Sequence, residues 1–150
     1  AALTLLETVF NICLANNSCS FASFNASASA KTLAYRAALE AIMTKTTWNI
    51  FKKMAYLRKS EKSFNAAISR SPNDVEIRFM RLAVQFEIPE YVGFSEDMET
   101  DRKFIVNHIE EFNVADLPRQ TLSEILAFMK RCNKFTSEQI EKFRGILASN

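Results

Sequence analysis

Apolar residues recur along most of the chain at the three- and four-residue spacing of amphipathic helices. The first such stripe contains Leu3, Leu6, Phe10 and Cys13, and it predicts a helix over residues 3–15. Further helices are expected at 28–45, 48–57, 60–70, 72–88, 96–112, 116–129 and 137–147. No strand-like alternation competes with them, so the pattern predicts an all-α fold of about eight helices in antiparallel pairs.

Polar residues mark several of the expected helix starts. Ser60 has the character of an N-cap, and Ser71 followed by Pro72 suits an N-cap and the first helical position. Asp74 then favours the positive end of the helix dipole. Residues 136–139, Thr-Ser-Glu-Gln, fit a capping box. These starts divide the chain into short helices joined by short loops.

The composition agrees with one helical domain. The 150 residues suffice for a single core, and only two glycines and three prolines leave little turn chemistry for a many-stranded fold. Thirteen phenylalanines indicate a core built on aromatic rings. We expect one domain over 1–150, with a helix and polar loop in 1–27, a core in 28–112 and a C-terminal helical pair in 113–150.

Residues 60–72 resemble the second helix of a tetratricopeptide (TPR) repeat. Phe64, Ala67 and Pro72 stand at the offsets of that repeat, and Phe51 matches the large residue of its first helix. In such repeats small residues let paired helices approach, an aromatic ring fills the gap between pairs, and proline ends the unit. The resemblance implies TPR-like stacking of helix pairs, as in an α–α superhelix.

A longer resemblance covers about residues 34–105. It is carried by Ala34-Tyr35-Arg36-Ala37-Ala38, Ala67-Ile68, Pro72-Asn73-Asp74-Val75-Glu76-Ile77-Arg78-Phe79-Met80-Arg81-Leu82, Ile88-Pro89, Gly93-Phe94 and Asp101. These segments are similar to a group of small exported proteins of Bacteroidetes bacteria, which carry a signal peptide. The resemblance implies a mature form after signal removal, a periplasmic or envelope location and a bacterial source. It supplies no reaction.

The net charge of +2 hides an uneven distribution. From Lys31 to Lys62 there are eight basic residues against Glu40 and Glu61, and residues 63–116 carry eleven acidic residues against five basic ones. We interpret this as two faces that complement each other within the fold. A field that steers a charged partner is the alternative.

The basic segment also contains aromatic side chains. The residues concerned are Lys52, Lys53, Arg58, Lys59 and Lys62, interleaved with Phe51 and Tyr56. Nucleic acid or an anionic membrane surface would suit such a face, but a solvated surface partly paired with the acidic half is the simpler interpretation. We therefore expect no nucleic-acid partner. We also expect no transmembrane segment, because no run of 18 or more apolar residues occurs.

Residues that carry chemistry are scarce. His108 is the only histidine, no Gly-x-Ser-x-Gly elbow accompanies it, and we expect it on a helix surface or half-buried. Cys13, Cys19 and Cys132 lack metal-ligand spacing; Cys13 and Cys19 either pair or remain thiols. Two glycines provide no phosphate-binding loop. The sequence therefore predicts a protein that is not an enzyme and has no metal or cofactor.

The most informative polar residues lie on one expected helix. Arg78, Arg81 and Gln85 are spaced three and four apart on the side opposite the predicted core. In helical-repeat folds such stripes line the concave groove, where two arginines can clamp a carboxylate such as a peptide C-terminus. With Tyr35 and Arg36 they form the candidate partner-binding set.

The same arginines have a purely structural alternative. An intramolecular network with Glu76 and Asp101 would fix the angles between helices, and an i,i+4 pair of Asp74 with Arg78 would support the helix itself. The structural interpretation is the simpler one.

These observations predict a non-enzymatic protein- or peptide-interaction or scaffolding module of the bacterial envelope. The alternative is a helical small-molecule or lipid-binding protein, for which the many phenylalanines would line a cavity. An enzyme would require His108, a cysteine and a carboxylate to converge in one cleft.

Overall fold

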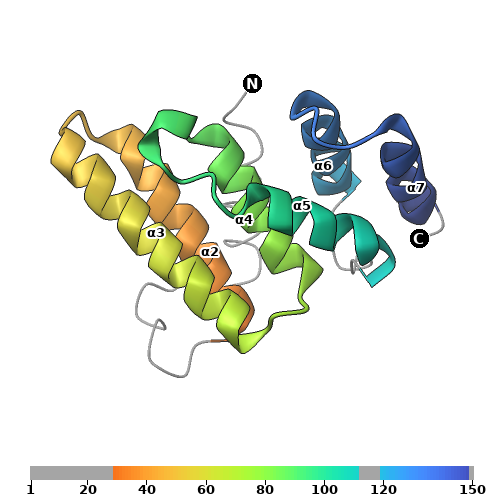
Figure 1. The fold of residues 1–150 in the computed structure, drawn as a ribbon, viewed down its shortest axis with the longest axis horizontal. Coiled ribbons are helices and arrows are strands. Elements are labelled where there is room, and N and C mark those ends of the chain that lie inside the picture. Colours follow the sequence, from red (N-terminus) through yellow and green to blue (C-terminus); the bar gives the residue numbers. More distant parts are fainter. Residues whose placement is uncertain (1–28, 112–118, 149–150) are drawn as a thin grey trace.

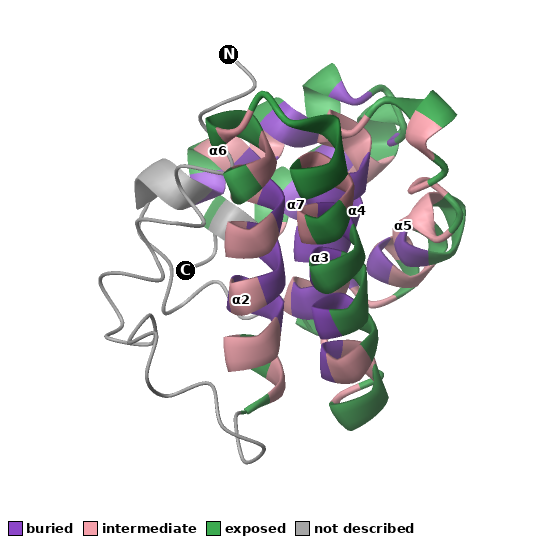
Figure 2. Ribbon diagram, turned by 90° about the vertical axis from the view of Figure 1, so that its left-hand side faces the viewer, coloured by how far each residue is buried: buried purple, intermediate pink, exposed green. Residues whose placement is uncertain are grey.

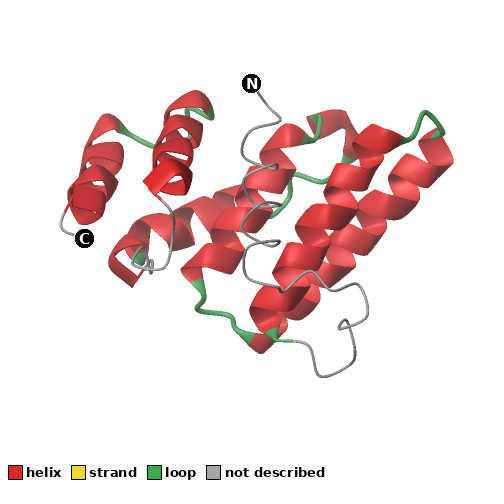
Figure 3. Cartoon of the chain, turned by 180° about the vertical axis from the view of Figure 1, so that it is seen from behind, coloured by secondary structure: helices red, strands yellow, loops and turns green. Residues whose placement is uncertain are grey.

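The computed structural model describes residues 29–111 and 119–148, and every regular element in these ranges is helical (Figure 1, Figure 3). The six α-helices of these ranges are α2 Ala30–Ile42, α3 Ile50–Arg70, α4 Val75–Glu87, α5 Met98–Asn107, α6 Arg119–Arg131 and α7 Ser137–Ala148. Three 3-10 turns accompany them, namely η2 Met43–Thr46, η3 Glu90–Val92 and η4 Ile109–Glu111. The all-α prediction is confirmed for this part of the chain. The predicted helix 3–15 and loop 16–27 lie outside the described residues.

Helix α3 is one continuous element of 21 residues, where the sequence predicts two helices with an N-cap at Ser60. That prediction is wrong, because Ser60 lies fully buried in the middle of α3. Leu57, Phe64 and Ala67 are buried at helical spacing on either side of it, so one face continues through the predicted boundary. The merger of two predicted helices, with one more outside the described residues, leaves six α-helices rather than about eight.

The turn between α3 and α4 also differs from the prediction. Ser71 ends α3, since its N–H donates to the carbonyl of Ala67 at 3.0 Å. Asp74 is the N-cap of α4 and accepts a hydrogen bond from the N–H of Ile77 at 3.2 Å. An aspartate caps as well as a serine, so the helix starts three residues later than predicted and leaves Pro72 in the turn.

The start of α7 follows the prediction. Thr136 Oγ1 accepts from the N–H of Gln139 at 3.2 Å, and Gln139 Oε1 accepts from the N–H of Thr136 at 3.0 Å. The capping box is therefore confirmed. Asn133 has a left-handed backbone (φ 51°) in the turn that leads from α6 to this cap.

Two apolar clusters share α4. Figure 2 shows the buried residues of the helices in purple. Ile77, Met80 and Val84 face α2 and α3, where a row of alanines on α2 permits close helix approach. The opposite cluster unites α4 with α5, α6 and α7. There the Phe128 ring meets that of Phe79 edge to face at a centroid distance of 5.5 Å. α4 is thus the central helix of the described fold.

Neighbouring helices contact one another in sequence order, with α2 against α3, α4 against α5 and α6 against α7. α2 also packs against α4. No helix within the described ranges has the length and apolar character needed to cross a bilayer.

Candidate functional site

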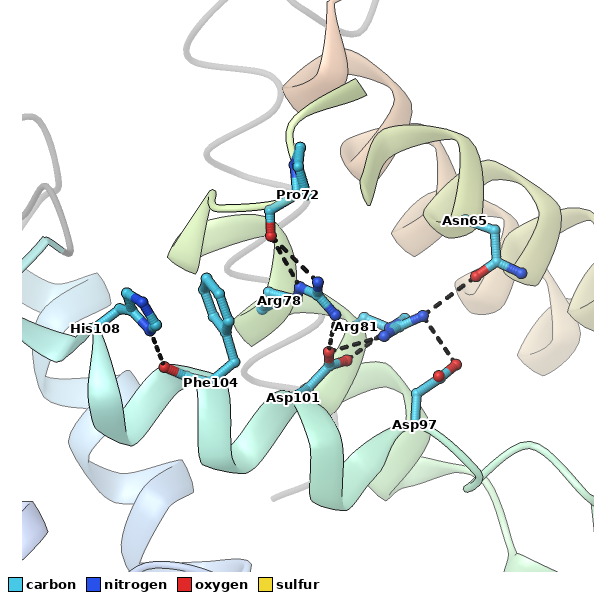
Figure 4. Close-up of polar contacts among 8 residues, drawn as sticks. All are labelled: Asn65, Pro72, Arg78, Arg81, Asp97, Asp101, Phe104 and His108. Carbon is cyan, nitrogen blue, oxygen red and sulfur yellow. Dashed lines mark hydrogen bonds and ion pairs between the residues drawn. The ribbon is translucent and has the colours of Figure 1, made fainter. Parts of the chain in front are cut away.

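Arg81 of α4 meets Asp101 of α5 in the interior of the molecule (Figure 4). Arg81 Nε donates to Asp101 Oδ2 at 2.6 Å and Arg81 Nη2 donates to Asp101 Oδ1 at 2.8 Å, which makes the contact bidentate. Asp101 is 0% exposed and Arg81 is also buried. A carboxylate in this position depends on its cationic neighbours, because water does not reach it.

Arg78 is the second cation on Asp101. Its Nη1 donates to Asp101 Oδ1 at 3.0 Å, and its Nη2 donates to the carbonyl oxygen of Pro72 at 3.2 Å. The guanidinium carbon also lies 4.9 Å from the centre of the Phe104 ring, within the range of a cation–π contact. Arg78 therefore connects the α3–α4 turn to α5.

The remaining donors of Arg81 reach two more elements. Its Nη1 donates to Asn65 Oδ1 of α3 at 3.2 Å and lies 2.8 Å from Asp97 Oδ2, just before α5. Asp97 and Asp101 are four residues apart and face Arg78 and Arg81, which are three apart. This cluster, the α4–α5 charge cluster, joins α3, α4 and α5 and has the form of the structural network considered from the sequence.

The carboxylate clamp stays a prediction, and the observed contacts of the two arginines show what ligand binding would require. A ligand carboxylate on Arg78 and Arg81 has to displace Asp101, which already occupies both guanidinium groups. The displaced aspartate would remain buried without its partners. Clamping by these arginines thus requires α5 to move away from α4.

Glu76 does not belong to this cluster. It accepts a hydrogen bond from Tyr35 Oη at 2.8 Å and pairs with Lys31 Nζ at 2.6 Å, and both partners lie on α2. Residues two apart on a helix point in different directions, so Glu76 and Arg78 reach opposite neighbours of α4. The predicted link between Glu76 and the arginines is therefore wrong. Burial, and secondarily the charge of Glu76, raises the pKa of Tyr35 above its usual value.

The other two candidates are placed elsewhere. Arg36 Nε donates to Glu40 Oε1 at 3.0 Å, and Glu40 Oε2 accepts from Ser63 Oγ of α3 at 2.8 Å. Gln85 is buried near the end of α4, and its Oε1 has no hydrogen-bond partner among the described residues. Of the predicted site residues, the structure brings only Arg78 and Arg81 together on a shared partner.

An exposed apolar surface lies where α2 passes into α3, and of its residues only Phe51, Lys52 and Lys53 belong to the basic, aromatic face that the sequence indicates. Trp48 is 99% exposed, Phe51 is 83% exposed, and Met43 and Ile50 are also exposed. We call residues 43–53 the hairpin end. Phe51, which matches the large residue of a TPR-like first helix, lies on this exposed surface.

The register of the hairpin explains this exposure. The Ser63–Glu40 hydrogen bond places the C-terminal part of α2 opposite the middle of α3, which is the longer helix. At 1.5 Å per residue, the first turn of α3 then extends beyond the last residue of α2. Ile50 and Phe51 occupy that turn beyond the end of α2, and both side chains are exposed.

His108 and Cys132 contact or are buried among residues of the fold, and no hydrogen bond joins the two side chains. His108 is half-buried, its Nδ1 donates to the carbonyl of Phe104 at 2.9 Å, and its ring stacks on the Phe104 ring at 4.1 Å. Cys132 is buried, and burial raises the pKa of its thiol. Cys13 and Cys19 lie outside the described residues. Among residues 29–111 and 119–148, no three potential ligands are grouped so that they could hold a metal ion.

Comparisons with known proteins identify no relative. No family model, curated protein or solved structure matches this chain at a significant level. Function has to be inferred from the geometry of the α4–α5 charge cluster and the hairpin end.

Proposed function

We propose that this protein is a non-enzymatic interaction or scaffolding module that binds through the hairpin end. The observation that carries the proposal is the exposure of Met43, Trp48, Ile50 and Phe51 on one short stretch of chain. Soluble proteins scatter single apolar residues over their surfaces, but grouped large apolar side chains are typical of contact surfaces. Trp and Phe are also residues on which binding energy concentrates.

The predicted polar binding residues support the same proposal, because most of them already contact other residues of the fold. Arg78 and Arg81 contact Asp101, and Tyr35 contacts Glu76, so these predicted binding groups already have partners within the fold. A protein or peptide partner is the class expected from the sequence. The hairpin end offers it a surface that no described residue occupies.

The proposed TPR-like stacking and the proposed envelope location rest on other observations. The contacts of α2 with α3, α4 with α5 and α6 with α7 are those of stacked helix pairs, and we propose TPR-like stacking for them. An envelope location rests on the resemblance of residues 34–105 to exported Bacteroidetes proteins. The small-molecule alternative stays a prediction with no observation in its favour.

Position-specific photo-cross-linking in the cells of origin tests this function. The photoreactive benzoylphenylalanine replaces Ile50 in one variant and Tyr91 in a control, because Tyr91 is an exposed aromatic residue on η3, outside the hairpin end. We expect adducts from position 50 and none from position 91. Equal labelling at both positions, or no adduct at position 50, would show that the hairpin end is not the contact surface.

A further inference from the structure

We propose that the hairpin end docks on the surface of an anionic lipid bilayer. This inference rests on the proposed function for its contact surface, and at that surface it assigns a lipid bilayer in place of the protein or peptide partner expected from the sequence. It is carried by two properties of residues 43–53, namely protruding apolar side chains and unpaired lysines.

The apolar side chains suit the membrane interface. Trp48 stands in the connection just before α3, and Ile50 and Phe51 are the first two residues of that helix. Indole and phenyl rings are favoured at the boundary between headgroups and acyl chains, where one part of the ring is dry and another is wet. Trp48 is 99% exposed, so almost no neighbouring atoms fix the position of its ring for a shape-complementary contact with another protein. A bilayer accepts such a side chain without shape complementarity.

The charges complement an anionic surface. Lys45, Lys52 and Lys53 lie within the hairpin end, and the sequence contains no acidic residue between Glu40 and Glu61. Within residues 29–111 and 119–148, none of these three lysines takes part in an ion pair with a neighbour. Each lysine near an anionic membrane strengthens binding by about fivefold. The three ammonium groups therefore remain available for lipid phosphates.

The orientation of α3 adds to this attraction. The helix begins at the hairpin end, its first turn contains no acidic residue, and its N-cap is the neutral Asn49. The positive end of the helix dipole consequently points toward the proposed membrane. In Figure 1 the connection between α2 and α3 lies at one extremity of the molecule, away from α6 and α7.

The side-chain composition favours a bilayer over nucleic acid. Aromatic rings and lysines would serve either partner, because bases stack on rings and phosphates attract lysines. Met43 and Ile50, however, are exposed aliphatic side chains next to those rings. Aliphatic groups offer no ring face for stacking, whereas they partition into acyl chains.

Trp48 reports directly on docking because it is the only tryptophan in the chain. The full-length protein is mixed with vesicles of phosphatidylcholine alone or of equimolar phosphatidylcholine and phosphatidylglycerol. We expect a blue shift of the emission and protection from iodide quenching with the anionic vesicles only. Raising the salt to about 1 M shortens the screening length to about 3 Å and should weaken the effect.

Variants separate the apolar contribution from the charge. Phe51→Ala should weaken co-sedimentation with anionic vesicles by about tenfold. Lys52→Gln combined with Lys53→Gln should weaken it by about 25-fold. Tyr91→Ala is the matched control, since it removes an exposed ring outside the hairpin end, and it should leave binding unchanged.

The outcomes are distinct. No blue shift and no co-sedimentation with anionic vesicles overturns the inference, as does equal binding to neutral vesicles. If position 50 cross-links to a protein or a nucleic acid while vesicles fail to bind, the hairpin end is a contact surface but the bilayer assignment is wrong. If the cross-linking contrast also fails, the proposed function itself is wrong.

Discussion

The α4–α5 charge cluster and the hairpin end reverse the usual distribution of polar and apolar groups. In the cluster, Asp101 is fully buried together with the guanidinium group of Arg81. At the hairpin end, Trp48 and Phe51 are almost fully exposed beside lysines. A buried charge costs free energy unless it is paired, and grouped apolar side chains on a surface are typical of a contact site. Both regions are therefore expected to have partners.

The difference between the two regions lies in whether the partner is part of the same chain. The charges between α4 and α5 find opposite charges and amide oxygens on neighbouring helices, and their interactions are complete within the fold. The rings of the hairpin end have no facing residues among those described. Candidate binding residues are therefore better sought among side chains without internal partners than among charged residues as such.

Replacing Asp101 should have the largest effect on stability. Asp101→Ala leaves the buried Arg81 with only the partly exposed Asp97 and removes the carboxylate partner of Arg78, and removing one member of a buried ion pair costs about 3–5 kcal/mol. Urea unfolding measures the loss. Glu99→Gln is the control, because Glu99 pairs with Arg102 on the surface of the same helix and its removal should change little. Equal effects of the two variants would mean that the cluster does not hold the fold.

Arg81→Ala should cost about 2–3 kcal/mol, because Asp101 keeps its contact with Arg78 but loses the bidentate partner. This variant also distinguishes a carboxylate clamp that binds a ligand from a purely structural α4–α5 charge cluster. A fall in melting temperature of several degrees without loss of binding identifies a structural arginine. Loss of a bound peptide without any change in melting temperature would restore the clamp.

Tyr35→Phe should cost about 1.5 kcal/mol near neutral pH, because it removes the hydrogen bond to Glu76. The difference depends on pH, since the raised pKa means that folding disfavours the tyrosinate. In the unfolded chain Tyr35 ionises near pH 10, so the wild-type protein loses up to about 1.4 kcal/mol per pH unit above that value. Tyr35→Phe lacks this contribution, and its deficit should shrink as the pH rises. An unchanged deficit in urea unfolding at pH 7 and pH 11 would contradict the buried position of the Tyr35 hydroxyl beside Glu76.

Two serines of α3 provide a smaller, matched contrast. Ser60 Oγ is buried and has no hydrogen-bond partner among the described residues, so Ser60→Ala should increase the free energy of unfolding by about 0.5–1 kcal/mol. Ser63 Oγ donates to Glu40, and Ser63→Ala should lower it by a similar amount. Differential scanning calorimetry of both variants checks the opposite signs. A loss of stability in Ser60→Ala would show that its hydroxyl has a role in the fold.

Much of the fold follows from the sequence because helical periodicity and capping are local properties. The capping box at 136–139 is an example, since its two hydrogen bonds depend only on residues three apart. The division of α3 could not be predicted in the same way. A serine followed by a buried stripe is compatible with an N-cap or with a mid-helix position, and the packing of α2 against that stripe decides between them.

For the site, too, local spacing could be predicted from the sequence, whereas contacts that depend on helix packing could not. The i,i+4 spacing of Asp97 and Asp101 and the i,i+3 spacing of Arg78 and Arg81 are visible in the sequence and prefigure the cluster. The contact of Arg81 with Asn65 is not, because it depends on the register between α3 and α4. Nor is the exposure of Trp48 and Ile50, because an apolar residue in a helical pattern is assigned to the core by default.

The central claim is that the exposed rings serve contact and not folding, and the double variant Trp48→Ala with Phe51→Ala tests it most directly. Its unfolding free energy is measured together with its docking to anionic vesicles and, by cross-linking from position 50, to cellular partners. We predict stability within about 0.5 kcal/mol of the wild-type protein and loss of docking. A loss of more than about 2 kcal/mol with docking retained would show that the two rings support the fold, and it would contradict the account.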